Sequence, residues 1–169
     1  AYFYNEKIMC ALGEGLGETG RLNPQGRVRA LNALRRFQKL AEGMGITPLT
    51  AVATAAMREA EDGPEFQAQI EAETGLRLWV IDGEEEARLS AQGVLLGWPG
   101  SYGLVCDIGG ASMELAEIAG GRVGKRVTSP LGPLKLRSVA GGKKGRRAHI
   151  KQVLEGLTGT LGPQKNRLF

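Results

Sequence analysis

The sequence is poor in cysteine, histidine and aromatic residues. Its 169 residues include two cysteines, one histidine, two tryptophans, three tyrosines and four phenylalanines. Cys10 and Cys106 lack metal-ligand spacing, which argues against a disulfide framework or a zinc site and favours reduced thiols in a cytoplasmic protein. His149 has no partner cysteine, so neither a zinc site nor histidine catalysis is expected. Because no apolar run approaches transmembrane length and no signal peptide is evident, we expect no membrane partner.

Glycine and charge are the two compositional features that stand out. The chain contains 26 glycines without a fixed period, which indicates tight turns and sites lined by backbone. Residues 1–120 carry 10 Lys/Arg and 17 Asp/Glu, a net charge of −7. Residues 121–169 carry 12 Lys/Arg and only one acid, Glu155, a net charge of +11. An acidic body with a basic tail indicates either an anion-binding half or a nucleic-acid-binding arm.

Alternating strand-like and helix-like segments predict an α/β fold. Strands are expected at 8–12, 49–53, 76–81, 103–108, 113–118 and 123–128. Helices are expected at 24–43, 63–74, 84–96 and 148–157, a short helix or turn at 54–60, and a basic loop at 141–147. The pattern over 49–108 predicts a parallel sheet with crossover helices, whereas 103–128 predicts an antiparallel meander. We expect a domain boundary near residue 104.

The segment Asp107–Glu114, with the sequence DIGGASME, is the strongest candidate site. An acid ends a hydrophobic strand, and a run of small residues lets backbone N–H groups approach a phosphate closely. Asp107 is a candidate ligand of a divalent cation, and Glu114 returns on the next strand. The alternative is an ordinary β-hairpin whose turn needs glycine.

Two further segments are candidates for phosphate chemistry. Gly83–Arg88 contains three consecutive glutamates at a helix start, where acids favour the helix dipole. One of these carboxylates could instead serve as general base for a water, and the residues alone do not choose among Glu84, Glu85 and Glu86. Arg58 follows a buried strand and could clamp a phosphate, or it could be a surface arginine paired with a neighbouring acid.

These three segments occur together, in this order, in one known family. Residues 3–157 resemble the exopolyphosphatase/guanosine pentaphosphate phosphohydrolase (Ppx/GppA) family, part of the sugar kinase–heat-shock protein–actin superfamily. The resemblance rests on residues 53–60 (ATAAMREA), 81–88 (IDGEEEAR) and 107–114, which are similar to the family's Asp-Ile-Gly-Gly-Gly-Ser-Thr-Glu. It implies an actin-like (ribonuclease H-like) α/β domain over 1–103 that lacks its first strands. The opening β-meander of a second, similar domain would follow over 104–169.

The resemblance also implies an activity. The family hydrolyses the terminal phosphoanhydride of inorganic polyphosphate or of guanosine pentaphosphate (pppGpp), using Mg²⁺. Glu86 matches the family's general base, and Asp107 and Glu114 match the acids associated with the metal and the attacking water. The remaining matches are to phosphate-binding residues: Arg58, Gly109, Gly110 and Ser112. The family tends to form homodimers, so the resemblance implies a homodimer as a further expectation.

The chain departs from the family pattern in ways that bear on activity. Ala111 replaces a glycine and Met113 replaces a threonine, which adds a methyl and removes a hydroxyl. Two further phosphate motifs of the family, one near its N-terminus and one in its second domain, are not found. We therefore expect an inner fragment with reduced or no hydrolysis. A non-catalytic polyphosphate- or nucleotide-binding fragment is the main alternative.

A nucleic-acid-binding module using the basic tail is the remaining alternative. Residues 121–168 contain no Phe, Tyr or Trp, so base stacking has little support and the sequence argues against nucleic acid as a partner.

Overall fold

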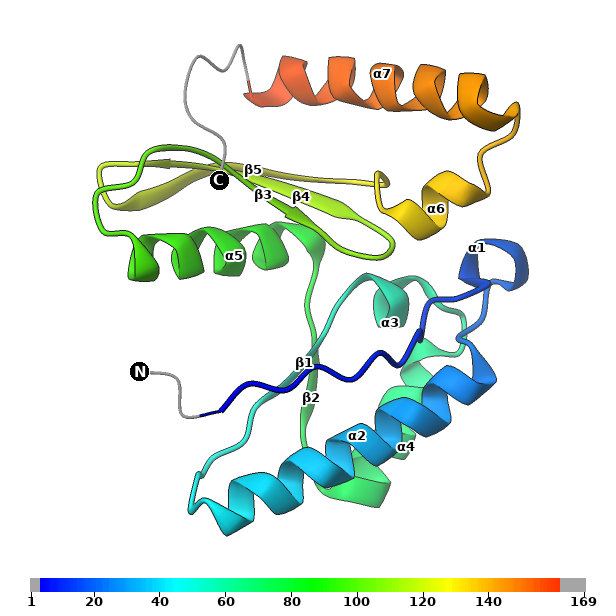
Figure 1. Cartoon of the computed structure of the whole chain (residues 1–169), viewed down its shortest axis with the longest axis vertical. Helices are drawn as coiled ribbons and strands as arrows, with labels where there is room; N and C mark the ends of the chain where they lie inside the picture. Colours follow the sequence, from blue (N-terminus) through cyan, green and yellow to red (C-terminus); the bar gives the residue numbers. More distant parts are fainter. Residues whose placement is uncertain (1–3, 162–169) are drawn as a thin grey trace. The chain divides into compact units, whose positions relative to one another are not determined.

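The computed structural model of the chain describes residues 4–161, which form an α/β fold in two compact units, one ending at Val80 and the other beginning at Ile81 (Figure 1). The first unit comprises α1 (Leu16–Thr19), α2 (Pro24–Gly43), β1 (Ala51–Ala53), α3 (Ala55–Glu59), α4 (Gly63–Thr74) and β2 (Leu78–Val80). The second comprises α5 (Gly83–Gly97), β3 (Gly103–Ile108), β4 (Met113–Ala119), β5 (Arg122–Ser129), α6 (Pro133–Arg137) and α7 (Gly142–Leu161). None of the helices described is long and apolar enough to cross a membrane.

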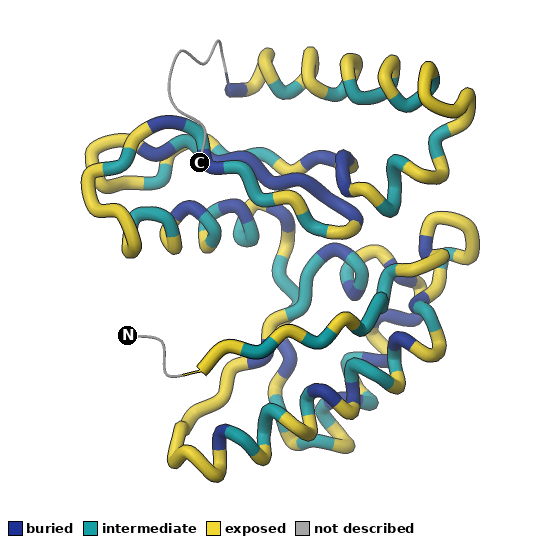
Figure 2. The backbone as a smooth tube through the Cα atoms, in the orientation of Figure 1, coloured by how far each residue is buried: buried dark blue, intermediate teal, exposed yellow. Residues whose placement is uncertain are grey.

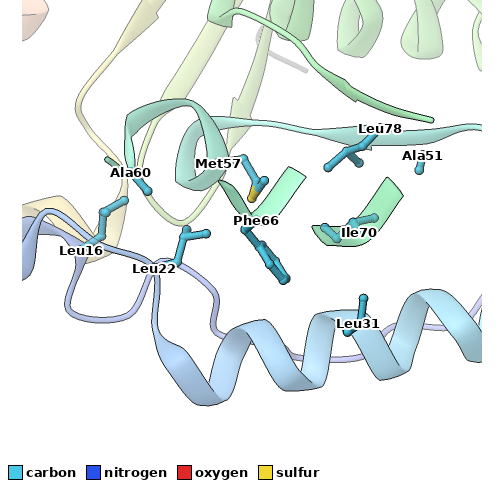
Figure 3. Packing of buried hydrophobic residues seen from close by; sticks show 9 residues of the cluster. All are labelled: Leu16, Leu22, Leu31, Ala51, Met57, Ala60, Phe66, Ile70 and Leu78. Atoms are coloured by element: carbon cyan, nitrogen blue, oxygen red, sulfur yellow. The ribbon is translucent and has the colours of Figure 1, made fainter. Parts of the chain in front are cut away.

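The first unit is built on a parallel pair of strands. β1 and β2 pair in parallel, with Ala51 opposite Leu78, as expected for strands joined by crossover helices. Helix α2 begins as predicted, because the Asn23 side chain accepts a hydrogen bond from the Gly26 N–H at 2.7 Å and Pro24 takes the first helical position. Figure 3 shows the hydrophobic cluster of this unit, in which Phe66 of α4 is fully buried.

A buried carboxylate fixes the loop between α1 and α2. Asp62 accepts a hydrogen bond from the Leu22 N–H at 2.9 Å and forms an ion pair with Arg27 at 3.2 Å. Burial opposes the ionisation of Asp62, but the Leu22 N–H and the charges of Arg21 and Arg27 together hold its pKa below its usual value. This network joins segments about forty residues apart in sequence.

The strand predicted at 8–12 is wrong. Within the described residues this segment pairs with no strand, and Ala11 has a positive φ of 53°, which interrupts an extended conformation. Its carbonyls instead bond to α2 and the loop before it: the Arg29 side chain donates to the Cys10 carbonyl, and the Asn23 N–H donates to the Leu12 carbonyl. Apolar content alone does not make a strand where backbone partners lie in a helix.

The second unit is a three-stranded antiparallel meander in the order β3-β4-β5, as predicted. Helix α5 covers one face of the sheet and α7 covers the other (Figure 1). On the α5 face, Ala87 and Ala91 pack against Val105, Ala116 and Ile118. Strand β4 is buried between the two helices along most of its length (Figure 2). Because α5 packs on this sheet, it belongs to the compact unit of the meander; the domain boundary proposed near residue 104 stays a prediction.

The basic segment 141–147 forms the beginning of a helix, not the predicted loop. Helix α7 runs from Gly142 to Leu161 and is preceded by Gly141 at a φ of 82°. Lysine and arginine are good helix formers, and Gly145 is needed because a Cβ there would lie 1.8 Å from the Ala140 carbonyl oxygen. The glycine that suggested a loop therefore permits a close backbone contact at the helix start.

Candidate functional site

Three polar residues form a row across the sheet of the second unit. In the strand register, Asp107 of β3 lies opposite Glu114 of β4, and Glu114 lies opposite Thr128 of β5. Directly opposed residues share one face of a sheet, so the three side chains lie on the same face. This is the α5 face, because Ala116, two residues after Glu114 on β4, packs against α5. The Thr128 hydroxyl donates a hydrogen bond to Oε1 of Glu114 at 2.8 Å. The meander thus brings together two carboxylates predicted as site residues.

Glu114 is an unusual residue for the interior of a sheet. Its relative exposure is 1%, and Oε2 is buried without a hydrogen-bond partner among the described residues. Burying a carboxylate oxygen without a partner costs free energy, so such a group calls for a functional explanation. Asp107 is better satisfied, because the Ser90 hydroxyl donates a hydrogen bond to its Oδ2 at 2.5 Å.

The three glutamates at the start of α5 have different surroundings. Asp82 caps the helix by accepting a hydrogen bond from the Glu85 N–H at 2.8 Å. Glu84 is exposed, and Glu85 is held by Arg88, whose Nε donates to it at 2.7 Å. Glu86 is partly buried, with Oε2 inaccessible to solvent. One turn later on the same side of the helix, Ser90 bonds Asp107, so helical spacing directs Glu86 toward the β3 side.

Gly83 seats the start of α5 against the sheet. A Cβ at this position would lie 2.5 Å from the Thr128 side chain, so only glycine lets the helix approach β5 this closely. The residue that Gly83 touches is the one that hydrogen-bonds Glu114. The helix start, the β5 hydroxyl and the buried carboxylate therefore form one contiguous cluster.

The turn from Gly109 to Ser112 connects Asp107 to Glu114. The Gly109 N–H donates to the Ser112 carbonyl at 3.0 Å, and neither Gly109 nor Gly110 has a positive φ. A Cβ at Gly109 would meet no atom closer than 3.7 Å. At Gly109, therefore, neither backbone conformation nor crowding requires glycine, which weakens the ordinary-hairpin interpretation.

The two departures from the family motif lie on the buried side of this turn. Ala111 has a relative exposure of 7% and packs so closely on Gly132 that a Cβ at Gly132 would lie 2.2 Å from its carbonyl carbon. Met113 packs with Leu115 and Leu131 on the α7 face of the sheet, opposite to Glu114. Ser112 is also buried. The Ala111 methyl and the Met113 thioether therefore contribute to packing.

A groove of about 700 Å³ extends from Asp107 along α5. Its walls include Ser90 and Gly93 of α5, Trp98 directly after α5, and Cys106 of β3. Burial, followed by the charges of Asp107 and Glu114, raises the pKa of the Cys106 thiol. Cys106 and Cys10 are both free and partly buried.

Arg58 lies in the other unit, at the end of the short helix α3. It is partly buried, and its N–H donates to the Thr54 carbonyl at 3.1 Å. Its contribution to a phosphate site stays a prediction.

Sequence reasoning missed Ser90 and Thr128. Ser90 was detectable as the residue one helical turn after Glu86. Thr128 was not, because its register depends on a β-bulge. The glycine turn pairs Ile118 with Val123, but a shift between Ala116 and Ile118 brings Thr128, in place of Val127, opposite Glu114.

Comparison with known proteins identifies the family to which the chain belongs. The sequence model of the Ppx/GppA phosphatase family matches residues 2–156. Exopolyphosphatase 1 of Mycobacterium tuberculosis is 32% identical and that of Mycobacterium leprae 31% identical, each over 113 residues. These alignments cover 66% of this chain and 33% of the relatives, so the chain spans about a third of their length.

Solved structures agree on the fold. The Aquifex aeolicus member of the Ppx/GppA family is 28% identical with a TM-score of 0.69, covering 94% of this chain and 54% of that one. An exopolyphosphatase-like protein is 27% identical with a TM-score of 0.80, covering 89% and 51%. The α/β fold described above therefore matches about half of each of these structures. On this evidence, the chain belongs to the Ppx/GppA phosphatase family.

Proposed function

We propose that the chain carries catalytic residues of an exopolyphosphatase-type phosphohydrolase, which releases the terminal phosphate of inorganic polyphosphate or of pppGpp. The observation that carries the proposal is the buried Glu114, whose Oε2 lacks a hydrogen-bond partner in the described chain, opposite Asp107 and beside the turn at Gly109, where a Cβ would meet no atom closer than 3.7 Å. Paired carboxylates beside a turn of small residues suit hydrolysis of a phosphoanhydride, which requires positioning and charge neutralisation.

In this proposal each residue has a defined role. Glu86 accepts a proton from the attacking water, whose oxygen bonds to the terminal phosphorus while the bridging oxygen leaves with the shortened phosphate chain. Partial burial of Glu86 supports the choice, because Glu84 is solvated and Glu85 is bound to Arg88. The phosphate-binding residues are Arg58, Gly109, Gly110 and Ser112.

Asp107 and Glu114 are the proposed ligands of Mg²⁺. Their fit is supported by the Glu114 oxygen described above and by the alignment of the two carboxylates across β3 and β4. In the described residues no three His, Cys, Asp or Glu side chains gather into a metal site. Mg²⁺ is commonly bound by one or two carboxylates with water and substrate phosphates, which two ligands satisfy. When bound, Mg²⁺ would neutralise charge on the phosphate oxygens.

The extent of the chain sets the expected activity. It spans about half of the solved Ppx/GppA structures. We therefore propose that the 169-residue chain hydrolyses polyphosphate weakly or not at all, and that a non-catalytic polyphosphate- or nucleotide-binding fragment is the alternative function.

Glu86→Gln separates these two functions. Phosphate release from long-chain polyphosphate and from pppGpp is measured with Mg²⁺, alongside calorimetric binding of tripolyphosphate. Because a general base contributes about a hundredfold to ten-thousandfold, the variant should lose turnover while retaining binding. Glu84→Gln, which removes the same charge from a solvated position, is the control and should keep whatever turnover the chain has.

The outcomes are distinct. Turnover that survives in Glu86→Gln at the level of Glu84→Gln would remove Glu86 from the mechanism. Binding without turnover in all three proteins would support the alternative. Turnover at rates typical of a full-length relative would contradict the expectation of a weakened fragment.

A further inference from the structure

A second groove lies on the other flank of α5, toward β5. It has a volume of about 740 Å³ and lies entirely within the second unit. Its polar walls carry three arginines and a glutamine, over an apolar floor. The principal lining residues are Arg88, Gln92, Leu95, Arg122, Val123 and Arg126.

Secondary structure explains why the arginines converge. Arg88, Gln92 and Leu95 are spaced four and three residues apart, so they form one stripe of α5. On β5, Arg126 lies opposite Ala116 on the α5 face, whereas Arg122 lies opposite Ala119 at the start of the strand, where alternation turns it to the other face; both arginines line the groove. Ala116 is small, which leaves room above it for the long side chain of Arg126. The stripe lies on the opposite flank from Ser90, which bonds Asp107.

Arg126 has the environment of a binding residue. Its Nε is buried and finds no acceptor in the part of the chain that the structure describes. Arginine presents a planar fork of donors that matches the oxygens of phosphate or carboxylate groups. A buried donor without an acceptor costs free energy, which a bound anion would recover.

One carboxylate competes for these arginines. Arg88 donates to both oxygens of Glu85. The hydrogen bond from Arg88 is the main reason that the pKa of Glu85 lies below its usual value; burial opposes the shift, and the charges of Arg88 and Arg126 add to it. Arg126 therefore acts electrostatically on this ion pair. Three guanidinium groups against one carboxylate leave the groove with an excess positive charge.

We propose that the groove between α5 and β5 binds a phosphate anion through Arg122 and Arg126, with Arg88 as a third donor. The apolar floor formed by Leu95 and Val123 lowers the local dielectric, which strengthens charge-assisted hydrogen bonds. The ligand is an oligophosphate or a smaller phosphate anion, because several separate guanidinium groups suit a ligand with several negative oxygens. This site uses none of the proposed catalytic residues.

The test measures binding of tripolyphosphate to the whole chain by isothermal titration calorimetry. Arg122→Gln combined with Arg126→Gln should weaken binding by about tenfold or more, because the charge-assisted hydrogen bonds of two guanidinium groups are lost. The matched control removes the same charge from the exposed first turn of α7, by Lys143→Gln with Lys144→Gln, and should change affinity less than about twofold. Equal weakening by the two pairs would overturn the proposal.

Glu85→Gln gives an effect of opposite sign. Without the competing carboxylate, Arg88 is released to the ligand and the groove gains positive charge, so affinity should rise. Misfolding does not produce such a gain, which protects the test against a variant that is merely damaged. Unchanged or weakened binding in Glu85→Gln would contradict the proposal.

Two probes distinguish the source of the phosphate. If inorganic phosphate competes with tripolyphosphate in the wild-type chain and Arg122→Gln/Arg126→Gln removes this competition, the ligand is a small free anion. If only long-chain polyphosphate competes, the groove holds a distant part of a polymer. Glu86→Gln should leave both results unchanged, so failure of the proposed hydrolysis and failure of this site can be told apart.

Discussion

The two flanks of helix α5 carry opposite charge, although one helix and one sheet form both. On the β3 flank, the groove ends at Asp107, which is held by Ser90. On the β5 flank, Arg122 and Arg126 face a groove of similar volume. The alanines between the flanks are fully buried against the sheet, and they separate the two grooves.

This difference gives a structural meaning to the charge division in the sequence. Strand β4 ends at Ala119 and β5 begins at Arg122, so the change from acidic to basic sequence near residue 120 falls in the turn between two paired strands. Neighbouring strands of a meander lie about 5 Å apart, so segments of opposite net charge become adjacent. The acidic body and the basic segment thus meet within one sheet.

Gly83→Ala should disturb the packing of α5 on both flanks, and we expect it to cause the largest loss of unfolding free energy. Its Cβ would lie 2.5 Å from the Thr128 side chain, so the start of α5 must move away from β5. Overpacking of this kind costs about 1–3 kcal/mol of unfolding free energy. Urea denaturation, followed by the fluorescence of Trp98 in a Trp79→Phe background, measures the loss.

Gly93→Ala is the matched control for that substitution. Gly93 lies in the middle of α5 and lines the β3-side groove, and a Cβ at this position would meet no atom within 4 Å. Replacing a helix-interior glycine by alanine should stabilise the chain by about 0.5–1 kcal/mol. Destabilisation by both variants would show that α5 tolerates no added methyl, and the close contact at Gly83 would then lose its special status.

The sequence predicted most elements but only part of the site. The strands of the meander and the cap at Asn23 follow from local patterns: short apolar runs, and an asparagine before a proline. The predicted strand at 8–12 failed because its carbonyls bond to Arg29 and Asn23, which apolar content does not reveal.

The side chains around the carboxylates depend on contacts between elements. Ser90 and Asp107 are seventeen residues apart, and Thr128 reaches Glu114 only through the bulge in the β4–β5 pairing. A shift by one residue exchanges the faces of a strand, so the turn at Gly120 and Gly121 would by itself predict the wrong partner. The arginine groove was hidden partly for the same reason, since the bulge, and not the turn alone, brings Arg126 opposite Ala116.

Glu114→Gln tests whether the negative charge of Glu114 on the β3 flank lowers the unfolding free energy of the chain. Asp107 and Glu114 are directly opposed, and like charges in that position destabilise a strand pair, so the amide should raise unfolding free energy by about 0.5–1 kcal/mol. The same variant should lose the Mg²⁺-dependent rise in melting temperature that the proposed metal site predicts. A variant that is less stable without Mg²⁺ would show that Glu114 is a structural group.

The Glu85–Arg88 pair on the β5 flank should give the smallest effect, visible as a dependence on pH. Because the pKa of Glu85 in the folded chain lies below the ordinary glutamate value of 4.5, its stabilisation is present above that pH and is lost as the pH falls through the folded pKa. The melting temperatures of wild type and Glu85→Gln should therefore differ at pH 6, and the difference should shrink as the pH is lowered below 4.5. Solvent exposure of both side chains keeps the difference small. Arg88→Gln should remove the same dependence, and a difference that persists undiminished at pH 3 would assign the effect of Glu85 to packing at the helix start.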